Sequence, residues 1–183
     1  MEFFKNLIKD LRKNSDFARK FLLGLSGAIF GILITYYLYP LQPYRIGLID
    51  TPSIFKKVVI YKMDKIYPNF DIIKDRLYVF KLPYETPYYK KGTLFIKYAK
   101  CVAGDRLEVK GLNFYCNGKL IAVAKKTDSK GIPVTHFEYN GTIPDGYFFA
   151  YAPHPRSYDS RYWGLVPIKN VVGEGILELG DWK

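Results

Sequence analysis

An uncharged apolar run near the N-terminus places the first constraint on how this chain folds. The run from Phe21 to Leu38, FLLGLSGAIFGILITYYL, holds eighteen residues without a charge, and two basic residues precede it. A helix of about this length crosses a hydrocarbon core of about 30 Å. Tyrosines gather at the C-terminal end of the run, where an interfacial aromatic belt would lie. The run therefore predicts a transmembrane helix over residues 21–40.

A cleavable secretory leader is the alternative interpretation of this run. The apolar part of such a leader is usually shorter and ends at small residues, whereas this one ends in Tyr-Tyr-Leu-Tyr-Pro, so a retained anchor is favoured. Five Lys and Arg residues lie in the fifteen positions before Phe21, and only Arg45 lies in the fifteen after Leu38. The positive-inside rule then predicts an N-terminus in the cytoplasm. The rest of the chain is expected in the periplasm, if the cell is a Gram-negative bacterium, with the anchor in the inner membrane.

Residues 1–20 combine apolar and basic side chains. Phe3, Phe4, Leu7, Ile8 and Leu11 recur at helical spacing among lysines, a pattern typical of an amphipathic helix that lies on the inner membrane surface. A frayed basic tail fits the same segment. The net charge of +11 indicates attraction to anionic lipid. No nucleic-acid partner is expected, because most of the chain would lie outside the cytoplasm.

Residues 41–183 have the pattern of an all-β domain. Short apolar runs alternate with Gly, Pro, Asn and Asp, and no long 3.6-residue periodicity or internal repeat is found. Their spacing favours a barrel or a coiled sheet over a sandwich. Residues 62–76 are left open between an irregular loop and a short helix. The expected strands are 58–61, 77–82, 94–99, 106–110, 113–116, 119–124, 146–151 and 171–179.

Several kinds of catalytic site are not supported by the sequence. His136 and His154 are far apart and have no Cys or carboxylate spacing that fits a metal site. A G-x-S-x-G elbow and a glycine-rich phosphate loop are also absent from the sequence. We therefore expect no cofactor and no metal, and interpret His154, between two prolines, as a loop residue. Of the kinds of catalytic site considered, a serine paired with a lysine remains.

A Ser/Lys dyad requires a lysine amine that is kept neutral, so that it can take the proton of the serine hydroxyl. Burial lowers a lysine pKa, and reaching about 8 from about 10.4 requires an apolar strand face. Lys97 alternates onto the same face of its strand as Phe95 and Ala99. By composition Lys100 serves almost as well, so periodicity alone leaves both lysines as candidates.

Three segments resemble the sequence boxes of the signal peptidase I family of membrane-anchored Ser/Lys endopeptidases. Residues 51–53, Thr-Pro-Ser, are similar to its nucleophile box. Residues 96–105, IKYAKCVAGD, are similar to the box with the general base, and residues 157–164, SYDSRYWG, to its S-x-D-S-R-Y-W-G box. Within the family, Thr-Pro-Ser and the lead-in at residues 154–157 are most similar to the branch that processes pilin precursors in conjugation and type IV secretion.

The resemblance implies a role for each residue of the candidate site. Ser53 corresponds to the nucleophile and Lys97, not Lys100, to the general base. The Ser53 backbone N–H and the Thr51 hydroxyl correspond to the oxyanion hole. Ser157 is expected to hydrogen-bond the Lys97 amine, Asp159 and Arg161 to pair, and Ser160 to support them.

The chain departs from the family pattern without losing a reacting group. Ala103 replaces a proline before Gly-Asp, Tyr98 replaces an arginine after the lysine, and Phe55 stands where a proline often follows the nucleophile. These changes affect the expected loop geometry. Cys101 and Cys116, fifteen apart, are left open between free thiols and a disulfide.

The resemblance implies a single-pass protease with a signal-peptidase-like coiled β-sheet or barrel after one N-terminal transmembrane helix. Its expected partners are membrane lipid and a precursor with a hydrophobic leader, with the pilin of a conjugative or type IV secretion system as the favoured substrate. A housekeeping leader peptidase is the alternative enzyme. A non-catalytic membrane-tethered assembly scaffold is the alternative from another class.

Overall fold

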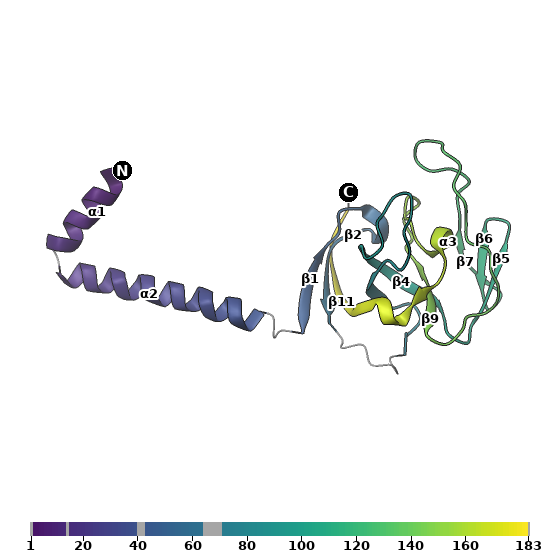
Figure 1. The fold of residues 1–183 in the computed structure, drawn as a ribbon, viewed down its shortest axis with the longest axis horizontal. Helices are drawn as coiled ribbons and strands as arrows, with labels where there is room; N and C mark the ends of the chain where they lie inside the picture. Colours follow the sequence, from purple (N-terminus) through teal and green to yellow (C-terminus); the bar gives the residue numbers. More distant parts are fainter. Residues whose placement is uncertain (1, 14, 40–42, 64–70, 183) are drawn as a thin grey trace. The chain divides into compact units, whose positions relative to one another are not determined.

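The computed structural model of the chain describes residues 2–13, 15–39, 43–63 and 71–182. It divides into two compact units, Met1–Pro43 and Tyr44–Lys183, which are described separately. The first unit is helical and the second is mainly β (Figure 1).

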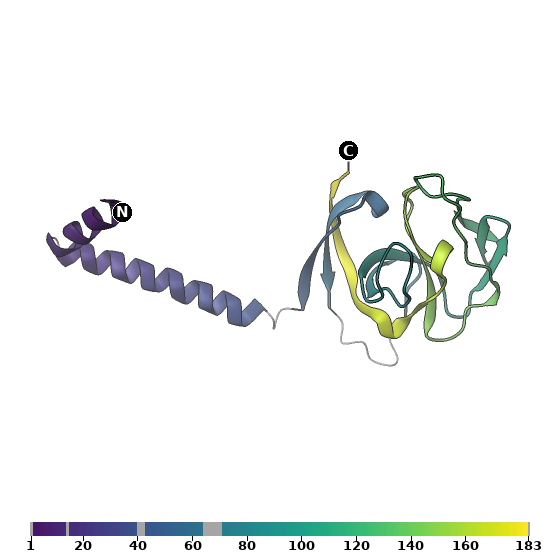
Figure 2. The ribbon, with the colours of Figure 1, turned by 45° about the horizontal axis from the view of Figure 1, so that its top comes forward.

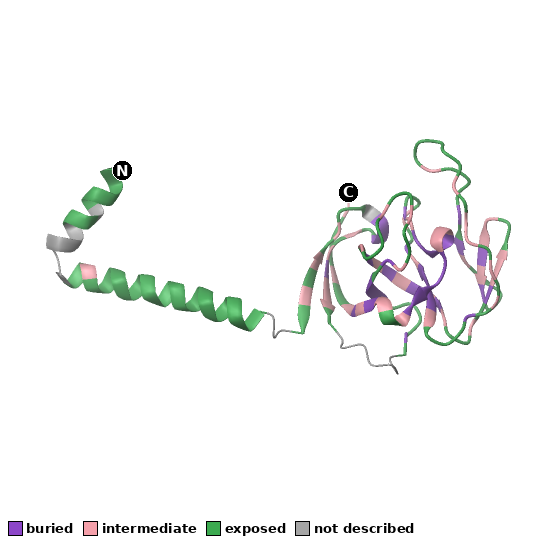
Figure 3. Ribbon diagram, in the orientation of Figure 1, coloured by how far each residue is buried: buried purple, intermediate pink, exposed green. Residues whose placement is uncertain are grey.

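The first unit contains the helices α1 (Glu2–Lys13) and α2 (Ser15–Leu38). Helix α2 begins at Ser15, before the predicted start at residue 21, because the helix continues through charged residues that precede the apolar run. Asp16 lies in its first turn, where the helix dipole favours a negative charge. The helix is long and apolar enough to cross a membrane, and its apolar side chains are exposed (Figure 3). It therefore fits a single-pass anchor.

The second unit contains two antiparallel sheets. Among the described residues, the larger sheet has the strand order β1-β2-β11-β3-β4-β9-β10 and the smaller has the order β7-β6-β5-β8. The larger sheet curls into a half-barrel, which the turned view in Figure 2 also shows. The strands are β1 (Tyr44–Leu48), β2 (Lys56–Lys62), β3 (Leu77–Lys81), β4 (Leu94–Val102), β5 (Arg106–Lys110), β6 (Asn113–Cys116), β7 (Lys119–Val123), β8 (Asn140–Thr142), β9 (Tyr147–Tyr151), β10 (Val166–Pro167) and β11 (Val171–Asp181). The short helices are η2 (Pro52–Ile54), α3 (Ser160–Trp163) and η3 (Ile168–Asn170).

All eight expected strands are present, with small differences in their ends, and the expected mainly β fold is confirmed. The sequence missed β1, β8 and β10. Strand β1 contains a glycine, which usually weakens a strand. Here a Cβ on Gly47 would lie 3.1 Å from Ile96 Cδ1, so the glycine gives Ile96 of β4 the room it needs. Within residues 62–76, positions 71–76 are irregular, and positions 64–70 lie outside the described residues.

Buried apolar side chains form three clusters in the second unit. One lies on the larger sheet around Tyr78, Phe80 and Phe148, and a second lies where the two sheets meet, around Leu107 and Phe149. Figure 3 shows this buried region in β4 and β9. The third cluster consists of Ile54, Val59, Leu77 and Ala152, and it packs beneath η2. The turn that carries Ser53 is therefore fixed to the core by the next residue in the chain.

A disulfide joins the two sheets. Cys101 of β4 and Cys116 of β6 are bonded, with their Cα atoms 5.8 Å apart. This resolves the alternative that the sequence left open. Cys101 lies on the strand that carries Lys97 and faces the same side of that strand. The bond therefore ties the smaller sheet to the strand of the candidate base.

Removing this disulfide is expected to destabilise the protein without removing a reacting group. Closing a loop of 15 residues restricts the unfolded chain, which is worth about 3 kcal/mol. The double variant Cys101→Ala, Cys116→Ala is expected to lose about that much free energy of unfolding in urea titrations of the detergent-solubilised chain. Reductant should destabilise the wild type and leave the double variant unchanged. Equal stability of the two proteins would contradict the prediction.

Candidate active site

The short helix η2 positions Ser53 between two strands of the larger sheet. Ser53 is buried, and Ile54 packs in a cluster whose partly buried members include Ile96 and Tyr98, the two neighbours of Lys97. The turn that carries Ser53 and the segment of β4 that carries Lys97 therefore share one packed region. Phe55, with φ of 61°, ends the turn and leads the chain into β2.

Lys97 lies on the inner face of β4, as its alternation with apolar residues predicted. Phe95, Lys97 and Ala99 are all buried, and Lys97 is only 2% exposed. Its amine lies 5.4 Å from the centre of the Phe95 ring. Burial lowers the pKa of Lys97 to about 8, while the Asp159 carboxylate opposes this shift and the Arg161 guanidinium adds to it. A large fraction of the amine is therefore neutral near pH 8.

The pH dependence of cleavage should follow the ionisation of Lys97. In a Ser/Lys dyad the reactive form of the lysine is the neutral amine, and that of Lys97 forms as pH rises through its pKa of about 8. We therefore expect kcat/KM for a leader-peptide substrate to rise about tenfold per pH unit below that value and to level above it. A rate profile between pH 6 and 9.5 measures this. A plateau that already begins at pH 6 would contradict a lysine base with this pKa.

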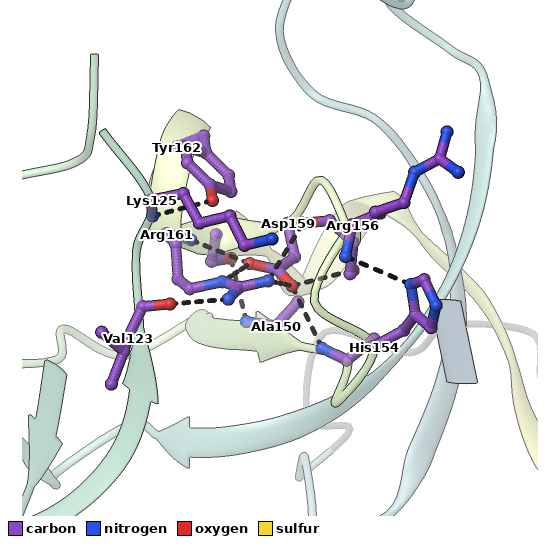
Figure 4. Close-up of polar contacts among 11 residues, drawn as sticks. Val123, Lys125, Ala150, His154, Arg156, Asp159, Arg161 and Tyr162 are labelled. Atoms are coloured by element: carbon purple, nitrogen blue, oxygen red, sulfur yellow. Dashed lines mark hydrogen bonds and ion pairs between the residues drawn. The ribbon is translucent and has the colours of Figure 1, made fainter. Parts of the chain in front are cut away.

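A buried polar network lies in the segment that joins β9 to α3 (Figure 4). Arg161 donates to Asp159 through Nε at 2.8 Å and through NH2 at 2.9 Å, and both residues are buried. Arg161 also donates to the carbonyls of Ser157 and Val123, which ties this segment to β7. The ion pair expected from the sequence is present, and its charges act on the Lys97 amine.

Two serines attach to this network. Ser157 Oγ donates to Asp159 Oδ2 at 2.9 Å, so its proton is directed at the carboxylate. The expected bond between Ser157 and the Lys97 amine is not among the contacts of the described residues. Ser160 Oγ accepts from the Ala150 N–H at 2.9 Å and thus holds α3 against β9.

The two expected oxyanion donors are the Ser53 N–H, which is engaged in a local hydrogen bond, and the hydroxyl of the exposed Thr51. The Ser53 N–H donates to the Thr51 carbonyl at 2.7 Å, within a three-residue turn. Thr51 itself is exposed. To bind an oxyanion, the Ser53 N–H would have to release the Thr51 carbonyl and donate to the substrate oxygen instead. The Thr51 hydroxyl is then the second donor that the sequence suggests for that position.

Removing the Thr51 hydroxyl should slow turnover without unfolding the protein. Loss of one oxyanion donor typically costs about 3 kcal/mol in the transition state. Thr51→Val keeps the shape of the side chain, and Thr51 lies outside the buried core. We expect kcat to fall about 100-fold and the melting temperature to stay the same. Thr51→Ser should retain most of the activity, and wild-type turnover by Thr51→Val would remove the residue from the oxyanion hole.

Sequence reasoning missed the link between His154 and the serine turn. The His154 N–H donates to the Ser53 carbonyl at 3.2 Å, and its ring meets the Phe55 ring at a centroid distance of 5.2 Å. Its position three residues before Ser157 was the only signal in the sequence. Within the described residues, the one group of metal-ligand type is Cys101, Asp105 and Cys116, in which both sulfurs are committed to the disulfide.

The curled sheet, the apolar helix and the buried lysine define a protein of the signal peptidase class. The chain belongs to the family described as signal peptidase, peptidase S26, whose family model matches residues 20–179. Its fold is similar to that of a signal peptidase I from Enterococcus faecalis, with 23% identity and a TM-score of 0.38 over 62% of this chain and 98% of the other.

Two curated relatives match part of this chain. A probable conjugal transfer protein TraF from Sinorhizobium fredii is 37% identical over 81 residues, which are 43% of this chain and 42% of the relative. A probable thylakoidal processing peptidase 2, chloroplastic, from Arabidopsis thaliana is 31% identical over 91 residues, which are 48% of this chain and 23% of the relative. The matched segments thus span less than half of these relatives.

Proposed function

We propose that the protein is a membrane-anchored Ser/Lys endopeptidase that removes hydrophobic leaders from exported precursors. The observation that carries this proposal is Lys97, a lysine buried on the inner face of β4 with a pKa lowered to about 8. A folded protein tolerates a buried amine at a cost in stability. A scaffold without catalysis would have no use for it, and this disfavours the alternative of another class.

The proposed reaction proceeds in two steps at Ser53. The neutral Lys97 amine takes the hydroxyl proton as Ser53 Oγ bonds to the scissile carbonyl carbon, and Thr51 and the Ser53 N–H hold the oxyanion. The Lys97 ammonium then gives the proton to the leaving amine as the C–N bond breaks, which leaves an acyl-enzyme. Water, deprotonated by Lys97, then attacks the ester carbonyl. The ester C–O bond breaks, the leader leaves with its new carboxylate, and the Lys97 ammonium returns the proton to Ser53 Oγ.

The polar network fixes the segment between β9 and α3 and sets the charges that act on the proposed base, Lys97. The Arg161–Asp159 pair holds the segment that contains Ser157 in place next to β9. The Asp159 carboxylate raises the pKa of Lys97 against the dominant effect of burial. In the proposed mechanism, Asp159, Ser160 and Arg161 support the site without touching the substrate, and Ser157 is held in this segment by its bond to Asp159.

The proposed substrate is a pilin precursor of a conjugative or type IV secretion system. The similarity to a probable conjugal transfer protein supports this choice. The similarity to a probable thylakoidal processing peptidase favours a second candidate, a general leader peptidase with many exported substrates. In both cases α2 would anchor the protein in the inner membrane with its N-terminus in the cytoplasm, α1 would contact lipid, and the β unit would lie in the periplasm.

Co-expression with tagged precursors tests the proposal. Wild type is expected to remove the leader of a pilin precursor and to leave unrelated exported precursors intact. Ser53→Ala should remove none, whereas Ser129→Ala, at an exposed serine in a loop, should act as wild type. Cleavage of all precursors alike would favour the general peptidase. Equal processing by wild type and Ser53→Ala would contradict the proposed nucleophile.

A further inference from the structure

We propose that His154 is a positioning residue that holds the turn of the nucleophile Ser53 in register with the segment beside Lys97. This inference rests on the proposed function, because it assigns a further role within the same site. His154 has three sets of contacts, through its main chain, its ring and its ring nitrogen. The backbone N–H and the ring connect the Ser53 turn, residues 51–55, with the 154–157 turn. The ring nitrogen binds within the 154–157 turn, to Arg156 (Figure 4).

The main chain of His154 joins the two turns directly. Its N–H donates to the carbonyl of Ser53 at 3.2 Å, and its carbonyl accepts from the N–H of Ser157 at 2.9 Å. The second bond closes a four-residue turn in which Pro155 follows His154, a position that favours proline. Ser157 in turn donates to Asp159. One residue therefore connects the nucleophile to the polar network.

The ring of His154 packs where the Ser53 turn ends. Phe55 has a φ of 61°, a left-handed conformation that is unfavourable for a bulky side chain and persists only where neighbours hold it. Two contacts hold it here. The Trp182 N–H donates to the Phe55 carbonyl at 3.1 Å, and the His154 ring meets the Phe55 ring edge to face. Loss of the imidazole would remove one of these contacts.

The ring nitrogen makes the third contact, which requires a neutral imidazole. His154 Nδ1 accepts from the Arg156 N–H at 3.1 Å, so the proton of the neutral ring is on Nε2. Protonation would turn Nδ1 into a donor facing another donor. The charged groups that act on the ring are Arg156 of the same turn, Lys125 after β7 and Lys97 of β4. Burial, aided by these three cations, lowers the pKa of His154.

This arrangement predicts a second acid limb in the rate profile. Above the pKa of His154, only protonation of Lys97 suppresses kcat/KM, and log kcat/KM rises with a slope of one. Below that pKa, protonation of His154 also disturbs the turn, and the slope rises above one over the range in which the histidine titrates. The pKa of His154 is lowered from the usual histidine value of about 6.5, so this change is expected below that pH.

The test measures cleavage of one precursor by full-length variants substituted at His154. His154→Ala removes the ring contact and the acceptor, and kcat is expected to fall about tenfold with KM within about twofold, a loss of about 1.4 kcal/mol in the transition state. An asparagine side chain accepts from the N–H two residues on and favours the first position of such a turn. His154→Asn should therefore recover most of kcat and retain a slope of one throughout. His136→Ala is the matched control and should behave as wild type.

The outcomes separate this inference from the proposed function. Precursor cleavage by wild type with unchanged kcat in His154→Ala would overturn the positioning role alone. A fall in kcat of His154→Ala that His154→Asn does not recover would also overturn it. So would a fall in kcat that is fully explained by a lower melting temperature of the variant. Wild type that cleaves no leader would overturn both. Reduced kcat in His154→Ala, recovery by His154→Asn and a slope above one confined to wild type and His136→Ala would support the inference.

Discussion

Lys97→Met is expected to abolish leader cleavage and to leave the fold intact. Methionine is close to lysine in length and apolar, so it can occupy the buried site on β4. Without the amine, no group in the proposed mechanism removes the proton of Ser53. Loss of a residue from such a catalytic unit lowers kcat by about 10⁴-fold or more. Purified variant and wild type would be compared in single-turnover cleavage of one precursor.

The neighbouring lysine provides the control for this substitution. Lys100 lies on the same strand but is paired with Asp75 at 2.5 Å on its more exposed side. Lys100→Met is expected to keep kcat within about twofold of wild type, since Lys100 is not on the buried face of β4 that carries Lys97. The free energy of unfolding of Lys97→Met should equal or exceed that of wild type, because burial penalises the charged amine. Substantial cleavage by Lys97→Met would exclude it as the base.

Asp159→Asn is expected to cause the largest loss of stability among single polar substitutions at the site. Asp159 is fully buried and accepts from five donors, of which Arg161 supplies three: Nε, NH2 and its backbone N–H. A neutral amide leaves the Arg161 guanidinium buried without its counter-charge, which costs about 3–5 kcal/mol. This is a large share of a typical total of about 5–15 kcal/mol. Urea unfolding followed by circular dichroism measures the loss.

A second effect of Asp159→Asn has a defined sign. The carboxylate raises the pKa of Lys97, so its removal should lower that pKa and move the rate profile of any residual activity to lower pH. Asp181→Asn is the control, because Asp181 pairs with Lys56 on the surface and its side chain is 75% exposed. Its expected cost is below about 1 kcal/mol. Equal stabilities of the two variants would contradict a structural role for the buried pair.

The sequence predicted the parts of the fold in which local pattern and tertiary environment agree. The inward face of β4 follows from alternation, and Lys97 is buried as that pattern requires. Strand β8, Asn-Gly-Thr, has the composition of a turn and forms only because β5 pairs with it. Likewise, the pairing of β11 with β3 is irregular between Val171 and Gly173. A Cβ on Gly173 would lie 2.3 Å from the Lys62 carbonyl oxygen, so only glycine fits there. Such tertiary constraints are not visible in a short window of sequence.

In the candidate site, too, the sequence indicated the residues but not their hydrogen-bond partners. The family resemblance indicated Ser53, Lys97 and the Asp159–Arg161 pair, and this pair is present. The proton of Ser157 is instead directed at Asp159, and the N–H of Ser53 at Thr51. The connection of His154 to Ser53 joins loops about a hundred residues apart in the chain. Hydrogen bonds between distant loops depend on how the sheet brings them together, and residue order does not specify their partners.

The ionisation of the Lys97 side chain can be measured directly by NMR. Carbon and nitrogen shifts of the lysine side chains, recorded between pH 6 and 12 on labelled full-length protein in detergent, follow each amine, and Lys97→Met identifies the signal. The proposed mechanism predicts a midpoint near 8 for Lys97, well below the usual lysine value of about 10.4. A Lys97 midpoint that coincides with those of the surface lysines would contradict it.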